Sequence, residues 1–248
     1  MGAVYVITKR NTESTTYENY GSWKKWDLTP FGTVKVKQHF YFTKLLAPYL
    51  LGRDDGHSVL EIGFGNGELA GWLNAHHSHV SWTGIEIQES LVSKARAAGF
   101  QAEADISKLD LQTSYDLIIA IDVIEHLTDI EIQDLFSKFN LLLKDDGTVI
   151  TRTPNAGGPL GLPNQTGDAT HITPISLSRL GGYLSDWDIT EQGDIQPVWE
   201  GKILSAIRNF CRLTLRAIIS GSIRFIFSPQ PKTLLASNLH LCFKKRAE

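Results

Sequence analysis

Apolar residues recur along this chain in two alternating patterns, namely short continuous runs and longer stretches with helical spacing. The continuous runs, at 58–62, 80–87, 100–104, 115–121 and 148–153, are typical of strands that are buried on both faces of a parallel sheet. Between them, the stretches at 33–47, 68–75, 89–98 and 128–143 repeat apolar residues every three or four positions, as amphipathic helices do. Strands that alternate with helices predict an α/β fold with a doubly wound, parallel sheet.

The pattern is looser after the fifth strand. Residues 154–170 contain four glycines and three prolines, and a connection of this length is usually a lid or a binding loop. We therefore expect a lid or a binding loop at 154–172. Further elements are predicted as a helix at 174–184, a strand at 187–190, a helix at 201–219 and a strand at 236–244.

A glycine-rich turn follows the first strand directly. Its glycines, Gly63, Gly65 and Gly67, permit positive φ angles and let a ligand approach the backbone. A dinucleotide motif, which binds pyrophosphate, would have its third glycine where Glu68 stands, and Glu61 adds a second acid. Two carboxylates favour a ligand with an ammonium and a sulfonium group and no phosphate, which is S-adenosylmethionine. The alternative is a glycine turn that binds no ligand.

Two further acids follow the next strands. Glu86 ends the second strand, where a carboxylate can accept hydrogen bonds from both ribose hydroxyls of an adenosine. Ile87 beside it would cover the adenine. Asp105 ends the third strand and would accept a hydrogen bond from the adenine amino group. Either acid alone could be a solvated loop residue, but acids at three successive strand ends form a more specific pattern.

With these residues in order, the chain resembles the class I S-adenosylmethionine-dependent methyltransferases. The motifs that carry the resemblance are 59–67, 84–86, 104–105, 115–127 and 147–155. The resemblance implies a Rossmann-like, mostly parallel seven-stranded sheet with an antiparallel last strand, and methyl transfer by direct displacement. The cofactor-binding residues that it implies are Glu61, Gly63, Phe64, Gly65, Gly67, Glu86, Ile87, Asp105, Ile106 and Ile121.

The run Asp122-Val123-Ile124-Glu125-His126-Leu127 follows the fourth strand. It resembles a subgroup that includes ubiquinone-pathway O-methyltransferases and small-RNA terminal 2′-O-methyltransferases. In that subgroup an acid, a Glu-His pair and a later histidine bind a divalent cation, which implies that Asp122, Glu125, His126 and His171 bind Mg²⁺ or Mn²⁺. The cation would lower the pKa of a substrate hydroxyl and orient it.

Two other roles remain open for these residues. His126 or His171 would serve as a general base, since imidazole titrates near neutral pH, and Asp122 would assist them. Alternatively, the Glu-His pair only orders the turn after the strand.

The acceptor substrate is indicated by sequence similarities that are weaker than those of the cofactor motifs. Thr153-Pro154-Asn155 and residues 167–174 resemble stretches of methyltransferases from polysaccharide-biosynthesis clusters. They imply that the loop at 154–172 forms the acceptor pocket. They also imply O-methylation of a sugar hydroxyl in the assembly of a cell-surface glycan of the O-antigen or capsule type. The alternatives are a small-molecule or quinone-type hydroxyl, an RNA 2′-hydroxyl, and a non-catalytic domain that binds a partner protein.

Basic residues are concentrated in the last part of the sequence. The net charge is only −3, yet residues 201–247 contain nine Lys and Arg and no Asp or Glu. Arg208, Arg212 and Arg216 recur every four residues on a predicted helix whose other positions are largely apolar. Such a basic amphipathic helix binds anionic membrane surfaces, here through residues 201–227, unless its apolar side packs on the domain. Nucleic acid is a less favoured partner, because we expect the aromatic residues of this segment to be buried or directed toward a membrane, whereas RNA binding would place them among the basic ones on an exposed face.

The remaining composition is ordinary. The two cysteines, Cys211 and Cys242, form neither a disulfide framework nor a metal motif. With no signal peptide and no apolar run of membrane-spanning length, we expect a cytoplasmic protein, peripheral at the inner face of the cytoplasmic membrane. No repeat divides the chain, so residues 1–248 are predicted as one domain. It comprises an N-terminal arm and cap helices (1–52), a cofactor-binding core (53–200), and the basic helix with the last strand (201–248). The N-terminal part is either a lid over the cofactor or plain packing.

Overall fold

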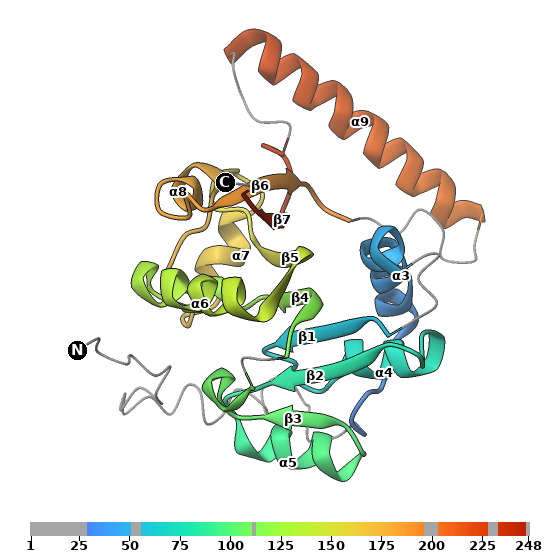
Figure 1. Ribbon diagram of the computed structural model, residues 1–248. Coiled ribbons are helices and arrows are strands. Elements are labelled where there is room, and N and C mark those ends of the chain that lie inside the picture. The colour runs from blue at the N-terminus through green and yellow to red at the C-terminus, as the bar shows by residue number, and fades with distance from the viewer. Residues whose placement is uncertain (1–28, 51–55, 111–112, 196–202, 228–232, 247–248) are drawn as a thin grey trace.

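The computed structural model describes residues 29–50, 56–110, 113–195, 203–227 and 233–246 (Figure 1). Within these residues, seven strands form one sheet with the order β3-β2-β1-β4-β5-β7-β6. The strands are β1 (Ser58–Ile62), β2 (Ser81–Ile85), β3 (Gln101–Glu103), β4 (Tyr115–Ile121), β5 (Leu143–Pro154), β6 (Trp187–Gln192) and β7 (Asn238–Lys245). Strands β1 to β5 pair in parallel, and β7 runs antiparallel between β5 and β6. The predicted Rossmann-like sheet is confirmed.

Helices cover both faces of this sheet. The helices of the described residues are α3 (Val36–Leu50), α4 (Glu68–His76), α5 (Glu89–Ala97), α6 (Asp129–Leu142), α7 (Leu162–Thr166), α8 (Leu177–Gly181) and α9 (Ile203–Phe227), with 3₁₀ turns η2 (Ile106–Lys108) and η3 (Ile124–His126). Of these, α9 does not lie on the sheet (Figure 1). Successive residues of one strand enter different hydrophobic cores. Ile118 belongs to the core that contains Phe136 of α6, whereas Ile119 belongs to the core that contains Trp72 of α4. This alternation explains why the strands read as continuous apolar runs.

The strand order reverses between β1 and β4. From β1 the chain builds outward through β2 and β3, and then returns to place β4 on the other side of β1. In open α/β sheets, the crevice at such a reversal, beyond the carboxyl ends of the strands, is where ligands bind. The fold therefore brings the turns after β1, β2 and β4 together.

Several local predictions are confirmed and others are corrected. The sequence Thr128-Asp129-Ile130-Glu131 predicts a capping box, and Thr128 caps α6 in such a box with Glu131. The sequence Asp145-Asp146-Gly147 predicts a turn, but these residues lie within β5, where the pairing with β4 shifts register: Leu143 pairs with Tyr115 while Thr148 pairs with Leu117. A proline commonly marks the end of a helix, yet Pro48 lies inside α3. Of the predicted N-terminal arm and cap helices (1–52), residues 1–28 lie outside the described residues.

The later elements also differ from the prediction. The loop at 154–172 contains the short helix α7, the helix predicted at 174–184 shortens to α8, and the basic helix extends to Phe227 as α9. In Figure 1, α9 stands apart from the sheet and its covering helices. Among the helices in the described part of the chain, none combines the length and the apolar character that crossing a bilayer requires.

Candidate active site

A cavity of about 380 Å³ lies at the carboxyl ends of β1, β2 and β4, where the strand order reverses. This volume falls in the range of small-molecule sites. The predicted cofactor-binding residues that line it are Glu61, Gly63, Phe64, Gly65, Glu86, Ile87, Asp105, Ile106 and Ile121. Gln38, Tyr41 and Phe42 of α3 also line it, so the helix ahead of the sheet forms part of the cavity wall.

Each glycine of the turn has a distinct structural reason. Gly63, Gly65 and Gly67 have φ angles of 69°, 55° and 75°, which residues with a side chain rarely adopt. A Cβ on Gly63 would lie 2.6 Å from the side chain of Val123, and one on Gly67 would lie 2.2 Å from the ring of Phe31. Gly67 is not among the residues that line the cavity, and its missing side chain makes room for Phe31.

Glu61 is an acid in an apolar setting. Its side chain is buried, and one carboxylate oxygen accepts a hydrogen bond of 2.9 Å from the indole nitrogen of Trp82. Burial raises the pKa of Glu61 to about 8; the Trp82 bond opposes this rise, and the nearby charges of Glu68 and Glu86 add to it. A cationic group beside Glu61 would favour the ionised form. The site is therefore suited to an ammonium group.

Glu86 is held by the glycine turn itself. Its two carboxylate oxygens accept hydrogen bonds from the backbone N–H groups of Gly65 (3.0 Å) and Gln88 (3.2 Å). Burial raises its pKa, while these backbone bonds lower it. Asp105 accepts a 2.8 Å bond from the N–H of Ser107 and so begins η2. Backbone bonds thus fix both acids beside the cavity.

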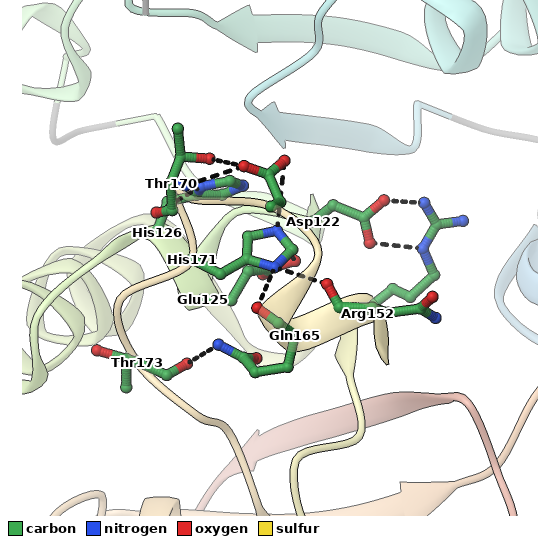
Figure 2. A network of polar contacts seen from close by, with 10 residues as sticks. Asp122, Glu125, His126, Arg152, Gln165, Thr170, His171 and Thr173 are labelled. Carbon is green, nitrogen blue, oxygen red and sulfur yellow. Dashed lines mark hydrogen bonds and ion pairs between the residues drawn. The ribbon is translucent and has the colours of Figure 1, made fainter. Parts of the chain in front are cut away.

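At the end of β4, Asp122 is paired with Arg152 of β5 (Figure 2). The guanidinium donates two hydrogen bonds to the carboxylate, one of them 2.8 Å long. The backbone of Asp122 has a φ of 55°, a strained value for a residue that is not glycine. Arg152 also lies 5.1 Å from the ring centroid of Tyr41, whose hydroxyl is 3.1 Å from Nε2 of His240.

Sequence reasoning missed Arg152 and Tyr41, both of which line the cavity. The available signal was the charge at position 152 in the otherwise uncharged run 148–153. Tyr41 gave no signal beyond its place in a helical pattern.

Behind this pair, Glu125, His126 and His171 form a compact cluster (Figure 2). One donor atom from each residue lies within 4.8 Å of the other two. The two imidazole rings are 4.7 Å apart and nearly perpendicular, and Nε2 of His171 is 4.0 Å from a carboxylate oxygen of Glu125. Three of the four predicted metal ligands are therefore together, whereas Asp122 is held by Arg152 and is not part of the cluster.

The loop at 154–172 orients both imidazoles. Nδ1 of His126 lies 3.2 Å from the carbonyl oxygen of Thr170, and Nδ1 of His171 lies 3.1 Å from that of Asn164. A proton on each Nδ1 satisfies these carbonyls and leaves Nε2 as the basic nitrogen. Burial and the neighbouring His171 lower the pKa of His126, so its ring is neutral near pH 7.

Glu125 is fully buried. Within the described residues, no hydrogen bond of ordinary geometry reaches either of its carboxylate oxygens. Burial raises its pKa to about 8, and the charge of Asp122 adds to this rise. A buried, unsatisfied carboxyl between two imidazoles fits a cation that would replace its proton.

The loop differs from its predicted role in one respect. None of the residues 154–172, all of which the structure describes, lines the cavity. The backbone after the loop is fastened to Glu125, whose carbonyl accepts bonds from the N–H groups of Ile172 (2.9 Å) and Thr173 (3.0 Å). The loop therefore supports the cluster from behind. Of the three predicted catalytic residues, His126 and Asp122 line the cavity and His171 does not.

Comparison with known proteins adds the family. Residues 37–188, more than half of the chain, match the model of a family described as a methyltransferase domain. No curated protein sequence matches the chain.

Solved structures agree with this assignment. A SAM-dependent methyltransferase from Archaeoglobus fulgidus is 18% identical, with a TM-score of 0.58 over 85% of this chain and 95% of that one. The plantazolicin methyltransferase BpumL in complex with SAH is 17% identical, with a TM-score of 0.57 over 94% and 92%. Coclaurine N-methyltransferase, bound to N-methylheliamine and SAH, is 16% identical, with a TM-score of 0.51 over 84% and 70%. The chain therefore belongs to the family of methyltransferase domains and has the fold of the class I S-adenosylmethionine-dependent enzymes.

Proposed function

We propose that this methyltransferase transfers the methyl group of S-adenosylmethionine to a hydroxyl, namely that of a sugar in the assembly of a cell-surface glycan. The proposed cofactor is supported by one observation: three acids from neighbouring strands, Glu61, Glu86 and Asp105, line the same cavity. That two of the similar structures contain SAH, the demethylated cofactor, also supports it.

Each acid has a part of the cofactor that it suits. When bound, the cofactor supplies a methyl group on a positively charged sulfur. Glu61 would bind the ammonium group, Glu86 would accept from the ribose hydroxyls, and Asp105 would accept from the adenine amino group. Ile87, which is 53% exposed at the rim, and Ile106 would cover the adenine ring.

On the acceptor side, we assign the general base to His126. It lines the cavity at the end of β4, and its neutral ring has a basic Nε2 that can take the hydroxyl proton as the new bond forms. Asp122 becomes a positioning residue, because Arg152 neutralises its carboxylate. His171 lies behind His126 and shapes its surroundings.

The cluster of Glu125, His126 and His171 also fits a divalent cation. Two imidazoles and one carboxylate suit Mn²⁺ better than Mg²⁺, which prefers oxygen ligands. When bound, the cation would lower the pKa of the acceptor hydroxyl. If activity survives both chelation and Glu125→Gln, the cation is excluded and His126 alone remains as the base. If Mn²⁺ restores the chelated wild type but not Glu125→Gln, the cation is supported.

The sugar acceptor rests on the resemblance of 153–155 and 167–174 to methyltransferases of polysaccharide-biosynthesis clusters. A small-molecule or quinone-type hydroxyl is the second candidate. Among the similar structures, one protein is a plantazolicin methyltransferase and another methylates nitrogen, so the fold alone does not select the acceptor. An RNA hydroxyl and a non-catalytic role rank lower, the latter because the three cavity acids are all present.

Titration calorimetry with S-adenosylmethionine tests the cofactor. Wild type and Glu89→Ala, which changes an exposed acid outside the cavity lining, should bind, whereas Glu86→Ala should bind much more weakly. Absence of binding to the wild-type protein would refute the proposal. Mass spectrometry of nucleotide sugars, lipid-linked saccharides and quinols after incubation then identifies the acceptor by the gain of one methyl group.

A further inference from the structure

Helix α9 turns its polar side toward the rest of the protein. The most buried of its described side chains are polar, namely Ser205 and Asn209, each 8% exposed. Arg216 continues the same stripe and donates to the carboxylate of Asp194 (2.8 Å) and to the carbonyl of Leu235. Positions 205, 209 and 216 lie on one face of a helix. This polar stripe is how α9 contacts the domain.

The apolar side of α9 faces solvent. Leu204 is 81% exposed, Phe210 69% and Phe225 89%, and no apolar side chain among those described on α9 is buried. At 3.6 residues per turn, Ile207, Phe210 and Phe225 lie roughly 140–200° around the helix axis from Ser205. The alternative reading of the sequence, in which the apolar side packs on the domain, is therefore wrong for the described residues.

Positive charge flanks this apolar face. Arg208 is exposed toward one border and Arg224 toward the other, whereas Arg212 is exposed beside the polar stripe. No acidic residue occurs between positions 201 and 247 to balance them. Arginine places its apolar stem along a hydrophobic surface while its guanidinium reaches a polar layer. An apolar face bordered by arginines matches the boundary between acyl chains and anionic headgroups.

We propose that α9 lies in the plane of a membrane that contains anionic lipids, with the apolar face in the acyl boundary. Arg208 and Arg224 then contact lipid phosphates. A second copy of this chain is a poorer occupant, because two such faces would bring arginines together. The helix is too polar to span the bilayer and is long enough to lie along it. This inference rests on α9 alone and does not depend on which acceptor is methylated.

Co-sedimentation of the full chain with vesicles tests the proposal. We expect binding to phosphatidylglycerol–phosphatidylcholine vesicles at low salt, and much weaker binding to phosphatidylcholine alone. The double variant Arg208→Gln/Arg224→Gln should bind anionic vesicles about thirtyfold more weakly. Phe210→Ser should also weaken binding, through loss of apolar area. Both changes affect exposed side chains, so the circular dichroism spectrum and the melting temperature should be unchanged.

The matched control is Lys35→Gln/Lys37→Gln, which removes the same charge from exposed positions outside α9. It should bind anionic vesicles like the wild type. Three results would overturn the proposal. The first is equal sedimentation of wild type with and without vesicles. The second is an equal loss in the control variant, which would indicate unspecific charge attraction. The third is self-association in light scattering that Phe210→Ser abolishes, which would make a second copy the occupant.

Discussion

Binding of the cofactor should release a proton from Glu61. Burial raises the pKa of this carboxyl to about 8, so in the free protein it is about nine-tenths protonated at pH 7. An ammonium group placed against it stabilises the carboxylate, and the proton must leave. The perturbation is Glu61→Gln, which keeps an oxygen that can accept from Trp82 and removes the titration.

The pH dependence of affinity follows from this pKa. If only ionised Glu61 binds the ammonium, the apparent affinity of the wild type should rise about ninefold between pH 6 and pH 7, and less steeply above. Glu61→Gln should bind more weakly, with an affinity that is flat over this range. Burial lowers the pKa of His126 below its ordinary value, which moves its own titration toward the acidic end of this range.

Calorimetry of S-adenosylhomocysteine binding in two buffers with different ionisation enthalpies counts the protons directly. We expect about 0.9 proton released per ligand by the wild type at pH 7 and about none by Glu61→Gln. The reasoning is refuted if the wild type releases less than about 0.2 proton, or if Glu61→Gln releases as many as the wild type, since Glu86 or another group would then be the source.

Stability of the free protein should change in the opposite direction. The folded pKa lies above the ordinary value of 4.5, so the folded state keeps a proton that the unfolded chain releases. Stability is therefore lost as the pH rises from about 4.5 to about 8. Glu61→Gln avoids this loss and should be more stable than wild type at pH 8, by at most about 4 kcal/mol. If Glu61→Gln binds the cofactor more weakly but unfolds at a higher temperature than the wild type, its weaker binding is not a consequence of misfolding.

Three further predictions concern the backbone and a helix end. In Gly71→Ala, the new Cβ would lie 1.9 Å from the carbonyl oxygen of Gly32, so thermal unfolding should show a loss of about 1–3 kcal/mol. Gly181→Ala, with nothing within 4 Å, should show none. Asp122→Asn should be more stable than Asp122→Ala by about 1 kcal/mol in urea, because Asn tolerates positive φ; equal losses would argue against strain there. Thr128→Ala should cost about 1 kcal/mol, and Thr128→Ser should restore most of it.

Local signals predicted the fold well. The bounds of β1 and β4 agree with the apolar runs, because a strand buried on both faces begins and ends where its apolar residues do. The three acids of the cofactor site were recognisable because each lies at or just beyond the carboxyl end of a strand, and parallel strands place such residues at one edge of the sheet. The order of the strands thus brings these three acids together although they are far apart in the sequence.

The acceptor side was less predictable because it depends on contacts between distant elements. That Arg152 would hold Asp122 depends on the register of β4 and β5, and on a positive φ that no neighbouring residue indicates. The orientation of α9 could not be predicted from its pattern either. An amphipathic helix ordinarily buries its apolar side, and only the contacts of Ser205, Asn209 and Arg216 show that it does not.

Strands β6 and β7 form an antiparallel pair whose connection contains α9. Where the chain leaves and re-enters this pair, Asp194 accepts bonds from the N–H groups of Ser237 and Asn238, and Thr233 donates to Glu191. These hydrogen bonds join the two ends of the connection that contains α9. The sheet therefore does not need the helix for its own hydrogen bonds. In evolutionary terms, the connection can lengthen, shorten or change its surface chemistry while the catalytic machinery is inherited intact. Where the enzyme resides and which reaction it performs can then be selected separately.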